Sequence, residues 1–327
     1  MQRSFSDLEY AAKKKVTRRD RFLAEIERLT PWAALEAALE PFYPKGGGRG
    51  RPPIGLARML RMYIAQQCFG LSDEGIEDAV YDSQAIRGFV GINLSREEAP
   101  DATTLLKFRR LLERHGLTRT IFETINAHLA DQGLMLREGT IVDATLIAAS
   151  PSTKNRAKAR DPQMHQTKKG KQYYFGMKAH IGVDAHSGLT HSLKGTAANV
   201  ADVTEAHALL HGQESEVFAD AGYQGVHKRA ENRDRNVTWR VAMKRTQRNA
   251  LPETRRGRTQ QRMERLKAGI RAKVEHPFHV VKNRLNHRKV RYRGLYKNEA
   301  QLFTLFGLAN LLLAGRSMRG VCAQGAS

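Results

Sequence analysis

The stretch that decides the fold reads Thr140-Ile141-Val142-Asp143-Ala144-Thr145-Leu146-Ile147. It is rich in β-branched residues, which favour an extended strand over a helix. Asp143 stands inside this apolar run, where a charge is costly to desolvate unless it is paired or holds a metal ion. The segment therefore predicts a strand that carries one exceptional acidic side chain.

Downstream of this strand, strand-like and helical segments alternate along the chain. β-branched and aromatic residues predict further strands at 173–183, 189–195, 216–220 and 237–243. Apolar residues at helical spacing predict helices at 202–210 and about 260–285, and a buried helix at 302–314. Three antiparallel strands, a helix, two more strands and a closing helix describe a mixed α/β fold.

Upstream of the deciding strand, the pattern is helical. Phe22, Ile26 and Leu29 recur at helical spacing, and two or three short helices are expected between residues 54 and 86. Asp101 is a good cap for a helix that carries Arg109 and Arg110 and stops near residue 116. Short helices with a basic, well-capped member fit a helix-turn-helix-like DNA reader, and a plain helical bundle is the alternative.

Glycines and prolines interrupt the helical pattern at residues 45–53. One interpretation is a linker, because these residues cannot continue a helix. The other is a clamp in which Arg49 and Arg51, on either side of a slim glycine, lie in a narrow A·T minor groove. The sequence leaves both open.

Positive charge is concentrated in the second half of the chain. The 327 residues carry a net charge of +22. Residues 1–138 contain 21 Lys and Arg against 19 Asp and Glu, whereas residues 139–327 contain 34 against 14. Such a surplus favours a polyanion as partner, with nucleic acid the first candidate. This asymmetry predicts two regions with different roles, a helical region at 1–138 and a more basic region at 139–327.

Several classes of protein are not favoured by the sequence. The longest apolar run, 302–314, is shorter than the roughly 20 residues that span a bilayer. The first ten residues contain no apolar stretch of signal-peptide length. Cys68 and Cys322 form neither a disulfide framework nor a metal-ligand spacing. A soluble protein in a reducing, cytoplasmic setting is expected.

Three acidic residues form the candidate active site. Asp220 ends one expected strand and Asp143 stands inside another; either alone is consistent with a strand-end cap or a buried ion pair. Glu275 lies on the closing helix, on one face with Arg271 and Lys282, where an Arg271–Glu275 surface pair is the alternative. Two Asp on strands and one Glu on a covering helix can hold two Mg²⁺ ions, an arrangement suited to cleaving a phosphodiester.

Other charged residues near these carboxylates have competing interpretations. Asp184 opens a turn and is expected to serve it, and Asp202 is expected to cap a helix. Lys178 and His180 share one face of the second strand, which either contacts DNA or contributes to the active site, or else is a solvated sheet face. The basic runs at 154–171, expected as a flexible loop, and at 276–298 flank the carboxylates, so phosphate contact is expected there.

A set of motifs occurs in a fixed order along nearly the whole chain. They are Glu9-Tyr10, Thr17-Arg18-Arg19, Gly70-Leu71-Ser72-Asp73, Val142-Asp143-Ala144-Thr145, Gly176-Met177-Lys178-Ala179-His180, Phe218-Ala219-Asp220-Ala221-Gly222-Tyr223, Ala272-Lys273-Val274-Glu275-His276-Pro277-Phe278 and Val290-Arg291-Tyr292-Arg293-Gly294-Leu295. In this order they resemble the DDE transposases of bacterial insertion sequences, specifically the large insertion-sequence-five group.

The resemblance implies that residues 1–138 bind DNA ends and assemble, and that residues 139–327 form a ribonuclease H-like catalytic domain. It also implies a bacterial protein that is associated with the nucleoid. Asp143, Asp220 and Glu275 would be its catalytic residues and would bind two Mg²⁺ ions, with Mn²⁺ as a substitute. The Tyr-Arg-Glu-Lys helix pattern of the group falls on this chain with Ala268 at the Tyr position. Arg271 and Lys282 match the pattern and would hold phosphates near the transposon end.

The implied reaction is phosphoryl transfer on DNA. Binding of the terminal inverted repeats would precede hydrolysis at the ends, and the freed 3′-OH would then attack target DNA. A homodimer assembled on DNA is expected, because two ends must be joined. DNA contacts are expected from Arg271, Lys282, Lys178, His180, Arg49, Arg51, Arg109 and Arg110. The alternatives are a regulatory or inactive relic that binds DNA without cutting it, and a nuclease that cuts without joining.

Overall fold

The computed structural model describes residue 10 and residues 12–46, 52–136 and 138–324. The chain divides into two compact units, one formed by residues 1–125 with 314–327 and the other by residues 126–313. Helices α8 (Leu117–Asp131) and α14 (Leu295–Gln324) each cross this division along the sequence. None of the described helices, α14 included, combines the length and the apolar character needed to cross a bilayer.

The first unit is helical, as the sequence predicts. Its helices are α2 (Arg18–Leu29), α3 (Trp32–Leu39), the 3₁₀ turn η1 (Glu40–Phe42), α4 (Leu56–Phe69), α5 (Asp73–Asp82), α6 (Gln84–Val90) and α7 (Ala102–Arg114). Asp101 caps α7, because its Oδ1 accepts a hydrogen bond of 2.5 Å from the Thr104 N–H. The apolar faces of these helices close a core that includes Ile26, Leu60 and Phe108.

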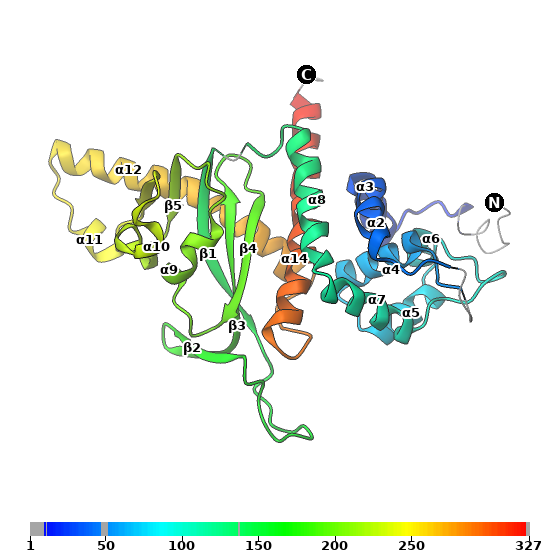
Figure 1. Cartoon of the computed structure of the whole chain (residues 1–327). Helices are drawn as coiled ribbons and strands as arrows, with labels where there is room; N and C mark the ends of the chain where they lie inside the picture. The colour runs from blue at the N-terminus through cyan, green and yellow to red at the C-terminus, as the bar shows by residue number, and fades with distance from the viewer. Residues whose placement is uncertain (1–9, 11, 47–51, 137, 325–327) are drawn as a thin grey trace. The chain divides into compact units, whose positions relative to one another are not determined.

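A six-stranded mixed sheet forms the centre of the second unit (Figure 1). Its strands are β1 (Gly139–Ala148), β2 (His165–Lys169), β3 (Gln172–Asp184), β4 (Thr190–Ala197), β5 (Glu216–Ala219) and β6 (Thr238–Val241). β3 pairs antiparallel with β1, β2 and β4, whereas β5 pairs parallel with both β1 and β6. The expected mixed α/β architecture is confirmed.

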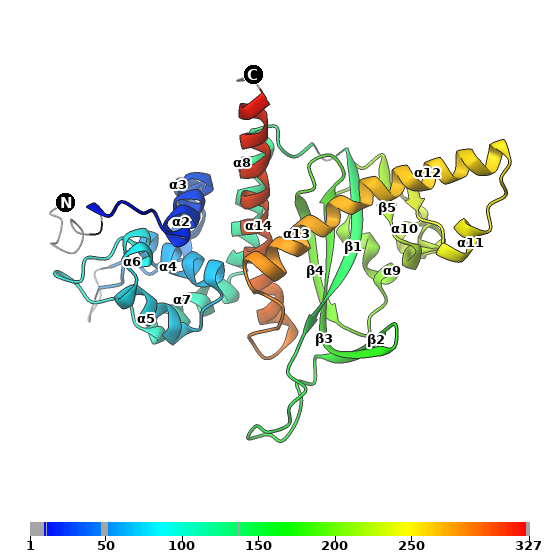
Figure 2. The same cartoon turned by 180° about the vertical axis from the view of Figure 1, so that it is seen from behind.

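Helices cover both faces of this sheet. One face carries α9 (Asp202–Glu205), the 3₁₀ turn η2 (Ala206–Leu209) and α10 (Ala230–Arg233), and the other carries α12 (Arg255–Arg271) and α13 (Glu275–His279), as opposite views show (Figures 1 and 2). Under η2, an apolar cluster joins Val142, Leu209, Val217 and Tyr223. Alternation along β1 therefore turns Val142 toward α9 and Asp143 toward the α12–α13 side.

The expected single helix at about 260–285 is a helical path with two breaks. It begins after the cap Thr254 with α12, tightens into the 3₁₀ turn η5 (Ala272–Val274), continues as α13 and widens into the π turn η6 (Val280–Arg284). Pro277 explains the first break. It lacks an N–H, and its ring crowds the carbonyl of Lys273, four residues earlier. The change in hydrogen bonding therefore lies just before Glu275.

The expected flexible loop at 154–171 contains strand β2, so that expectation is wrong for its last part. β2 lies at the edge of the sheet and is almost entirely exposed. Because it has no buried face, it lacks the alternation of apolar and polar residues that identifies a strand in a sequence. A short helix, α11 (Arg245–Asn249), was likewise not expected.

Candidate active site

The parallel pairing of β1 and β5 brings two of the predicted acids together. Val142 lies beside Ala219 in the register of these strands. Asp143 and Asp220 are the next residue along each chain segment, so they come side by side, and neighbouring strands lie only about 4.8 Å apart. Side chains alternate between the two faces along a strand, so both aspartates lie on the face of the sheet that α12 and α13 cover. Figure 2 shows these helices over that face.

Backbone N–H groups hold one oxygen of each aspartate. Asp143 Oδ1 accepts from the Ala144 N–H at 2.7 Å, and Asp220 Oδ1 accepts from the Gly222 N–H at 2.8 Å. A Cβ at Gly222 would lie 2.9 Å from that Asp220 oxygen, so a larger residue here would displace the carboxylate. Across the described chain, no hydrogen bond is made to the second oxygen of either carboxylate.

Glu275 begins α13 and lines a surface pocket of about 470 Å³. Lys282 and Thr145 line the same pocket, and the Lys282 Nζ donates a hydrogen bond of 2.6 Å to the Thr145 Oγ1. Thr145 is two residues beyond Asp143 on β1 and shares its face of the sheet. This hydrogen bond ties the α13–η6 segment to the strand that carries Asp143.

The three carboxylates share one electrostatic environment. Burial raises the pKa of Asp143 most, and the hydrogen bond from the Ala144 N–H opposes it. The negative charges of Asp220 and Glu275 raise this pKa further, Arg271 lowers it, and the result is about 7. Burial, with the nearby Lys169 and Arg288, lowers the pKa of Lys282, and the charge of Glu275 opposes this. Asp143 thus feels two like charges that the protein leaves largely unneutralised.

The donor set fits a hard divalent cation. It consists of six carboxylate oxygens, four of which have no hydrogen-bond partner among the described residues, and a cation among them would relieve the repulsion that adds to the effect of burial on the Asp143 pKa. As the side chains stand, no three His, Cys, Asp or Glu residues of the described chain converge closely enough to hold a metal ion. The carboxylates are therefore close to one another, but their side chains do not form a closed set of metal ligands.

Arg271 and two residues that sequence reasoning did not single out complete the neighbourhood. Arg271, at the end of α12, is half-buried and acts electrostatically on both Asp143 and Tyr223. Burial and the charges of the nearby aspartates raise the pKa of the Tyr223 hydroxyl, which is fully buried and has no hydrogen-bond partner among the described residues. Tyr223 belongs to the sequence motif around Asp220, which was the available signal. Thr145 had none.

The predicted face of Lys178 and His180 is neither solvated nor free to meet DNA. His180 is fully buried, its Nε2 lies 2.8 Å from the Thr196 Oγ1, and burial lowers its pKa to about 4. The expected DNA contact by His180 is therefore corrected to a structural role. The Lys178 Nζ donates to the Val200 carbonyl at 2.7 Å and to Asp202 at 2.8 Å. This face is covered by α9 and η2, which the strand pattern alone could not reveal.

Two further acids have roles in the fold. Asp184 Oδ2 accepts from the Ser187 N–H at 2.8 Å, which confirms the expected turn. Asp202 is the first residue of α9, and the cap is Ala201. The expectation of a helix cap is therefore wrong, and the side chain of Asp202 instead pairs with Lys178.

The predicted DNA contacts of the first unit separate into three groups. Arg109 is 8% exposed, binds Asp73 through two N–H groups and lies 3.8 Å from Glu113, so its direct DNA contact is corrected to a buried ion pair. Arg110 is exposed on the same helix. Arg49 and Arg51 lie outside the described residues.

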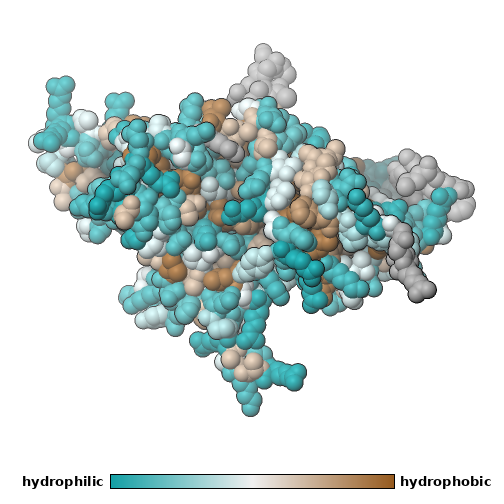
Figure 3. Space-filling model, viewed as in Figure 1, coloured by the Kyte–Doolittle hydropathy of each residue, from teal (hydrophilic) through white to brown (hydrophobic). Residues whose placement is uncertain are grey.

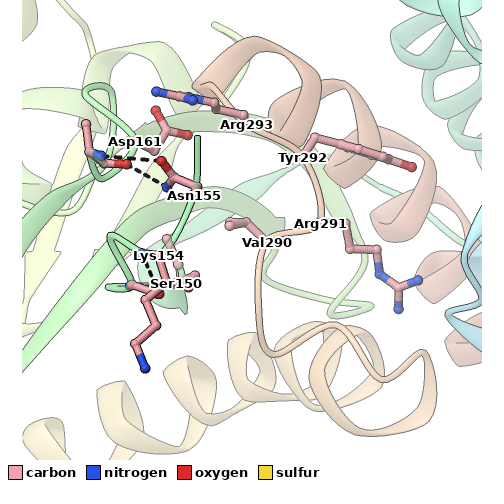
Figure 4. Close-up of a pocket in the computed structure, with 11 residues that line it drawn as sticks. Ser150, Lys154, Asn155, Asp161, Val290, Arg291, Tyr292 and Arg293 are labelled. Atoms are coloured by element: carbon pink, nitrogen blue, oxygen red, sulfur yellow. Dashed lines mark hydrogen bonds between the residues drawn. The ribbon is translucent and has the colours of Figure 1, made fainter. Parts of the chain in front are cut away.

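The two basic runs meet at a second pocket, of about 350 Å³ (Figure 4). It is lined by Ala149, Ser150, Ser152, Lys154, Asn155, Ala159, Asp161 and residues 290–293. The Asp161 Oδ2 accepts from the Gly294 N–H at 2.6 Å and holds the loop in place. Figure 4 shows the Lys154 side chain extending away from residues 290–293, and Lys154 is exposed. Phosphate contact by these runs stays a prediction.

A sheet of this kind, with acidic side chains at its parallel strands and basic surroundings, is typical of enzymes that act on nucleic-acid phosphates. Residues 135–311, more than half of the chain, match the family model described as the transposase DDE domain. The chain belongs to this family, whose members are metal-dependent enzymes that cut DNA and transfer strands. Residues 10–111 also match a transposase domain (DUF772). No solved structure matches the chain.

Proposed function

We propose that this transposase belongs to the insertion-sequence-five group, with Asp143, Asp220 and Glu275 as its catalytic triad. It binds the terminal inverted repeats of its element, cuts at the ends and joins the freed 3′-OH to target DNA. The observation that carries the proposal is the placement of Asp143 beside Asp220 on parallel strands, with Glu275 on the covering helix close enough to raise the Asp143 pKa.

A ribonuclease H-like core is the fold we assign to the second unit. The strand order β4-β3-β1-β5-β6, with three antiparallel strands followed by two parallel ones, supports this assignment. In such a sheet, acids on the two central parallel strands and on a helix across one face meet at one edge of the sheet. This arrangement explains how three residues far apart in sequence come to act on one phosphodiester.

Asp143, Asp220 and Glu275 would hold two Mg²⁺ ions, for which Mn²⁺ substitutes. When bound, the ions supply an activated oxygen nucleophile and stabilise the charge that develops at the phosphate. Asp143 must be ionised to bind a metal ion. Because its pKa is raised, it would release a proton when the metal ions bind. Arg271 and Lys282 would position the flanking phosphates, so that attack and departure lie in line.

The first unit is proposed to read the terminal repeat through a helix-turn-helix-like arrangement. α7 supports this proposal, because its exposed residues Thr103, Lys107, Arg110 and Arg114 share one helix face, whereas Arg109 points inward. A row of polar and basic side chains on a well-capped helix suits a groove of DNA. Joining two ends further requires two active sites, so the DNA-bound form is proposed to be a homodimer.

The test uses a supercoiled plasmid that carries the element's own ends, incubated with the full-length protein and Mg²⁺. We expect cutting at the ends followed by joining, and a loss of both in Glu275→Gln and in reactions with EDTA. Glu253→Gln is the matched control, because Glu253 is an exposed glutamate in the same unit, just before α12. We expect this variant to cut like the wild type.

The outcomes separate the proposal from its alternatives. Cutting that survives Glu275→Gln would remove Glu275 from the triad. Cutting without joining would indicate a nuclease. Binding of the ends that is equal in the wild type and in Glu275→Gln, with no cutting under Mg²⁺ or Mn²⁺, would favour a regulatory or inactive relic.

A further inference from the structure

Helix α12 presents two faces of very different chemistry. It belongs to a segment, residues 244–271, that contains ten Lys and Arg and only two acidic residues. In both cartoon views α12 crosses the sheet and runs on beyond β5 (Figures 1 and 2). Hydrophilic side chains gather over α11 and the beginning of α12, at the left of Figure 3. A projecting basic helix of this kind is a candidate for binding an anionic partner.

The inner face of α12 is docked on the segment that comes after β6. Glu264 is 3% exposed, and its carboxylate accepts from the Met243 N–H at 2.9 Å and from the Lys267 Nζ at 2.7 Å. The Lys267 Nζ also donates to the Val241 carbonyl at 3.2 Å. Burial by itself raises the pKa of Glu264, but the hydrogen bonds from Lys267 and Met243 outweigh it and the pKa is lowered. Glu264 and Lys267 are thus satisfied within the protein.

The outer face carries an arginine stripe, which we define as Arg255, Arg258, Arg262 and Arg265. All four side chains are exposed, and at 100° per residue they fall within about 80° of one another on the helix. Arg258 donates to the Glu253 carbonyl at 2.9 Å. The side chains of the other three make no hydrogen bond or ion pair with any described residue. Within the described chain, no carboxylate neutralises the stripe.

Helix stability does not account for these arginines. The stripe begins in the first turn of α12, which contains no acidic residue. Positive charge is unfavourable at this end of a helix, because the helix dipole already places partial positive charge there. Arg255 and Arg258 therefore gain nothing from the helix dipole, and the four exposed cations together favour an external anion as their partner.

We propose that the arginine stripe binds successive phosphates of one DNA strand beside the cleavage point. The stripe extends about 15 Å along the helix, which corresponds to about four phosphates of one strand at 3.4 Å each. Along the helical path, Arg265 and Arg255 stand about 15 and 30 Å from Glu275, or about four to nine base pairs. The expected distance from the cleavage point, in base pairs, rests on the proposed role of Glu275. The proposal that the arginine stripe binds phosphates does not.

The test measures binding of full-length protein to a duplex of the element's end in EDTA, so that no cutting occurs. Salt is varied from about 50 to 200 mM, and the variant is Arg255→Ala/Arg262→Ala/Arg265→Ala. Losing three phosphate contacts should lower the slope of log affinity against log salt by about 2.7. Over this range the wild type should then lose about forty-fold more affinity than the variant. Arg→Lys at the same three positions should restore most of the slope.

Position within the helix supplies a matched control. Arg256 is exposed and adjacent to Arg255, but lies off the stripe by more than a quarter turn. Arg256→Ala should leave the slope unchanged, whereas Arg255→Ala should lower it by about 0.9. Uncharged methylphosphonates placed about four to nine base pairs from the cut should weaken the wild type and leave the triple variant unaffected. The thermal midpoint of the triple variant should be equal to or above that of the wild type, which shows that it folds.

Three results would overturn the inference. One is an unchanged salt slope in the triple variant. A second is an equal effect of Arg256→Ala and Arg255→Ala, which would mean that only overall charge matters. The third is a change in oligomeric state with DNA binding intact, which would assign the stripe, with the exposed Leu266 beside it, to a second copy of the chain. If only the methylphosphonate result differs from the expected distance, the arginine stripe is still a phosphate site, and the proposed role of Glu275 is contradicted.

Discussion

Asp143 occupies a position that is electrostatically unfavourable for a carboxylate in the absence of a cation. Its pKa is about 7 in the folded chain, against an ordinary value of 3.8. Between these two values the folded state binds more protons than the unfolded state. The contribution of Asp143 to stability is therefore greatest below about pH 4 and is lost as the pH rises toward 7.

Asp143→Asn should remove this loss of stability. In EDTA at pH 8 we expect its free energy of unfolding to exceed that of the wild type by on the order of 1–4 kcal/mol. At about pH 3.5 the two proteins should be equally stable. Urea denaturation at both pH values checks the prediction, and a variant that is less stable than the wild type at pH 8 would contradict it.

Arg109 and Arg110 are adjacent in sequence but have opposite environments. Arg109→Ala would leave Asp73 and Glu113 without their buried partner, so we expect a loss of about 3 kcal/mol in unfolding free energy. Arg110→Ala should stay within about 0.5 kcal/mol of the wild type, while weakening binding to the element's ends. Thermal denaturation and a binding titration of the two variants separate these effects. Equal destabilisation by both would be inconsistent with the buried pair.

For single residues, the sequence shows which side chains are unusual better than it predicts what packs around them. Asp143, Asp220 and Glu275 could be selected because acids are rare inside strands and because their motifs are ordered. The burial of His180 and Arg109 could not be predicted. It depends on α9 and α5, whose positions are set by packing and not by the local pattern.

Most elements with an apolar face were predictable. Helix α8 is the exception, because it was not expected although Ile121, Ile125 and Leu129 are buried at helical spacing. β1, β3 and β5 have buried residues in regular positions and appear where the sequence places them. β2 is exposed on both faces and is held only by backbone pairing with β3, which leaves no trace in the pattern of hydrophobic residues. The outer helical path was predicted as one helix, because its apolar spacing does not reveal where the hydrogen bonding changes.

The break before Glu275 leads to a prediction at the level of the element. A 3₁₀ turn advances about 120° per residue against 100° for an α-helix, so η5 rotates the downstream helix α13 by about 60°. Pro277→Ala should allow the α-helix to continue through Ala272–Val274 and rotate Glu275 away from Asp143. We expect end cutting to fall at least tenfold, since a shift of about 1 Å can cost about a hundredfold in rate.

Two measurements define this outcome. Stability should be unchanged or higher, because a proline inside a helix costs about 3 kcal/mol. Affinity for end DNA in EDTA should also be unchanged, which separates misplacement of Glu275 from loss of substrate binding. Full cutting activity in Pro277→Ala would show that the 3₁₀ turn is not needed to place the glutamate.

Across the whole molecule, positive charge is concentrated in one part of the chain. The excess of positive charge falls almost entirely after residue 138, in the part of the chain that contains the sheet, the two basic pockets and α12. A field of this kind attracts DNA at a distance and makes association strongly dependent on salt. Residues 1–138 are nearly neutral, with 21 Lys and Arg against 19 Asp and Glu, so the contribution of their helices to binding must come mainly from the shape and hydrogen bonding of faces such as that of α7.

The side-by-side placement of Asp143 and Asp220 also has a consequence for the chain while it is being synthesised. The two strands are joined by a parallel pairing with β3, β4 and α9 lying between them in sequence. Such long-range pairings form slowly and only after the intervening segment has been synthesised. Glu275 emerges later still, so a growing or truncated chain leaving the ribosome cannot assemble the proposed triad. The order of residues along the chain thus delays any nuclease activity until the protein is nearly complete.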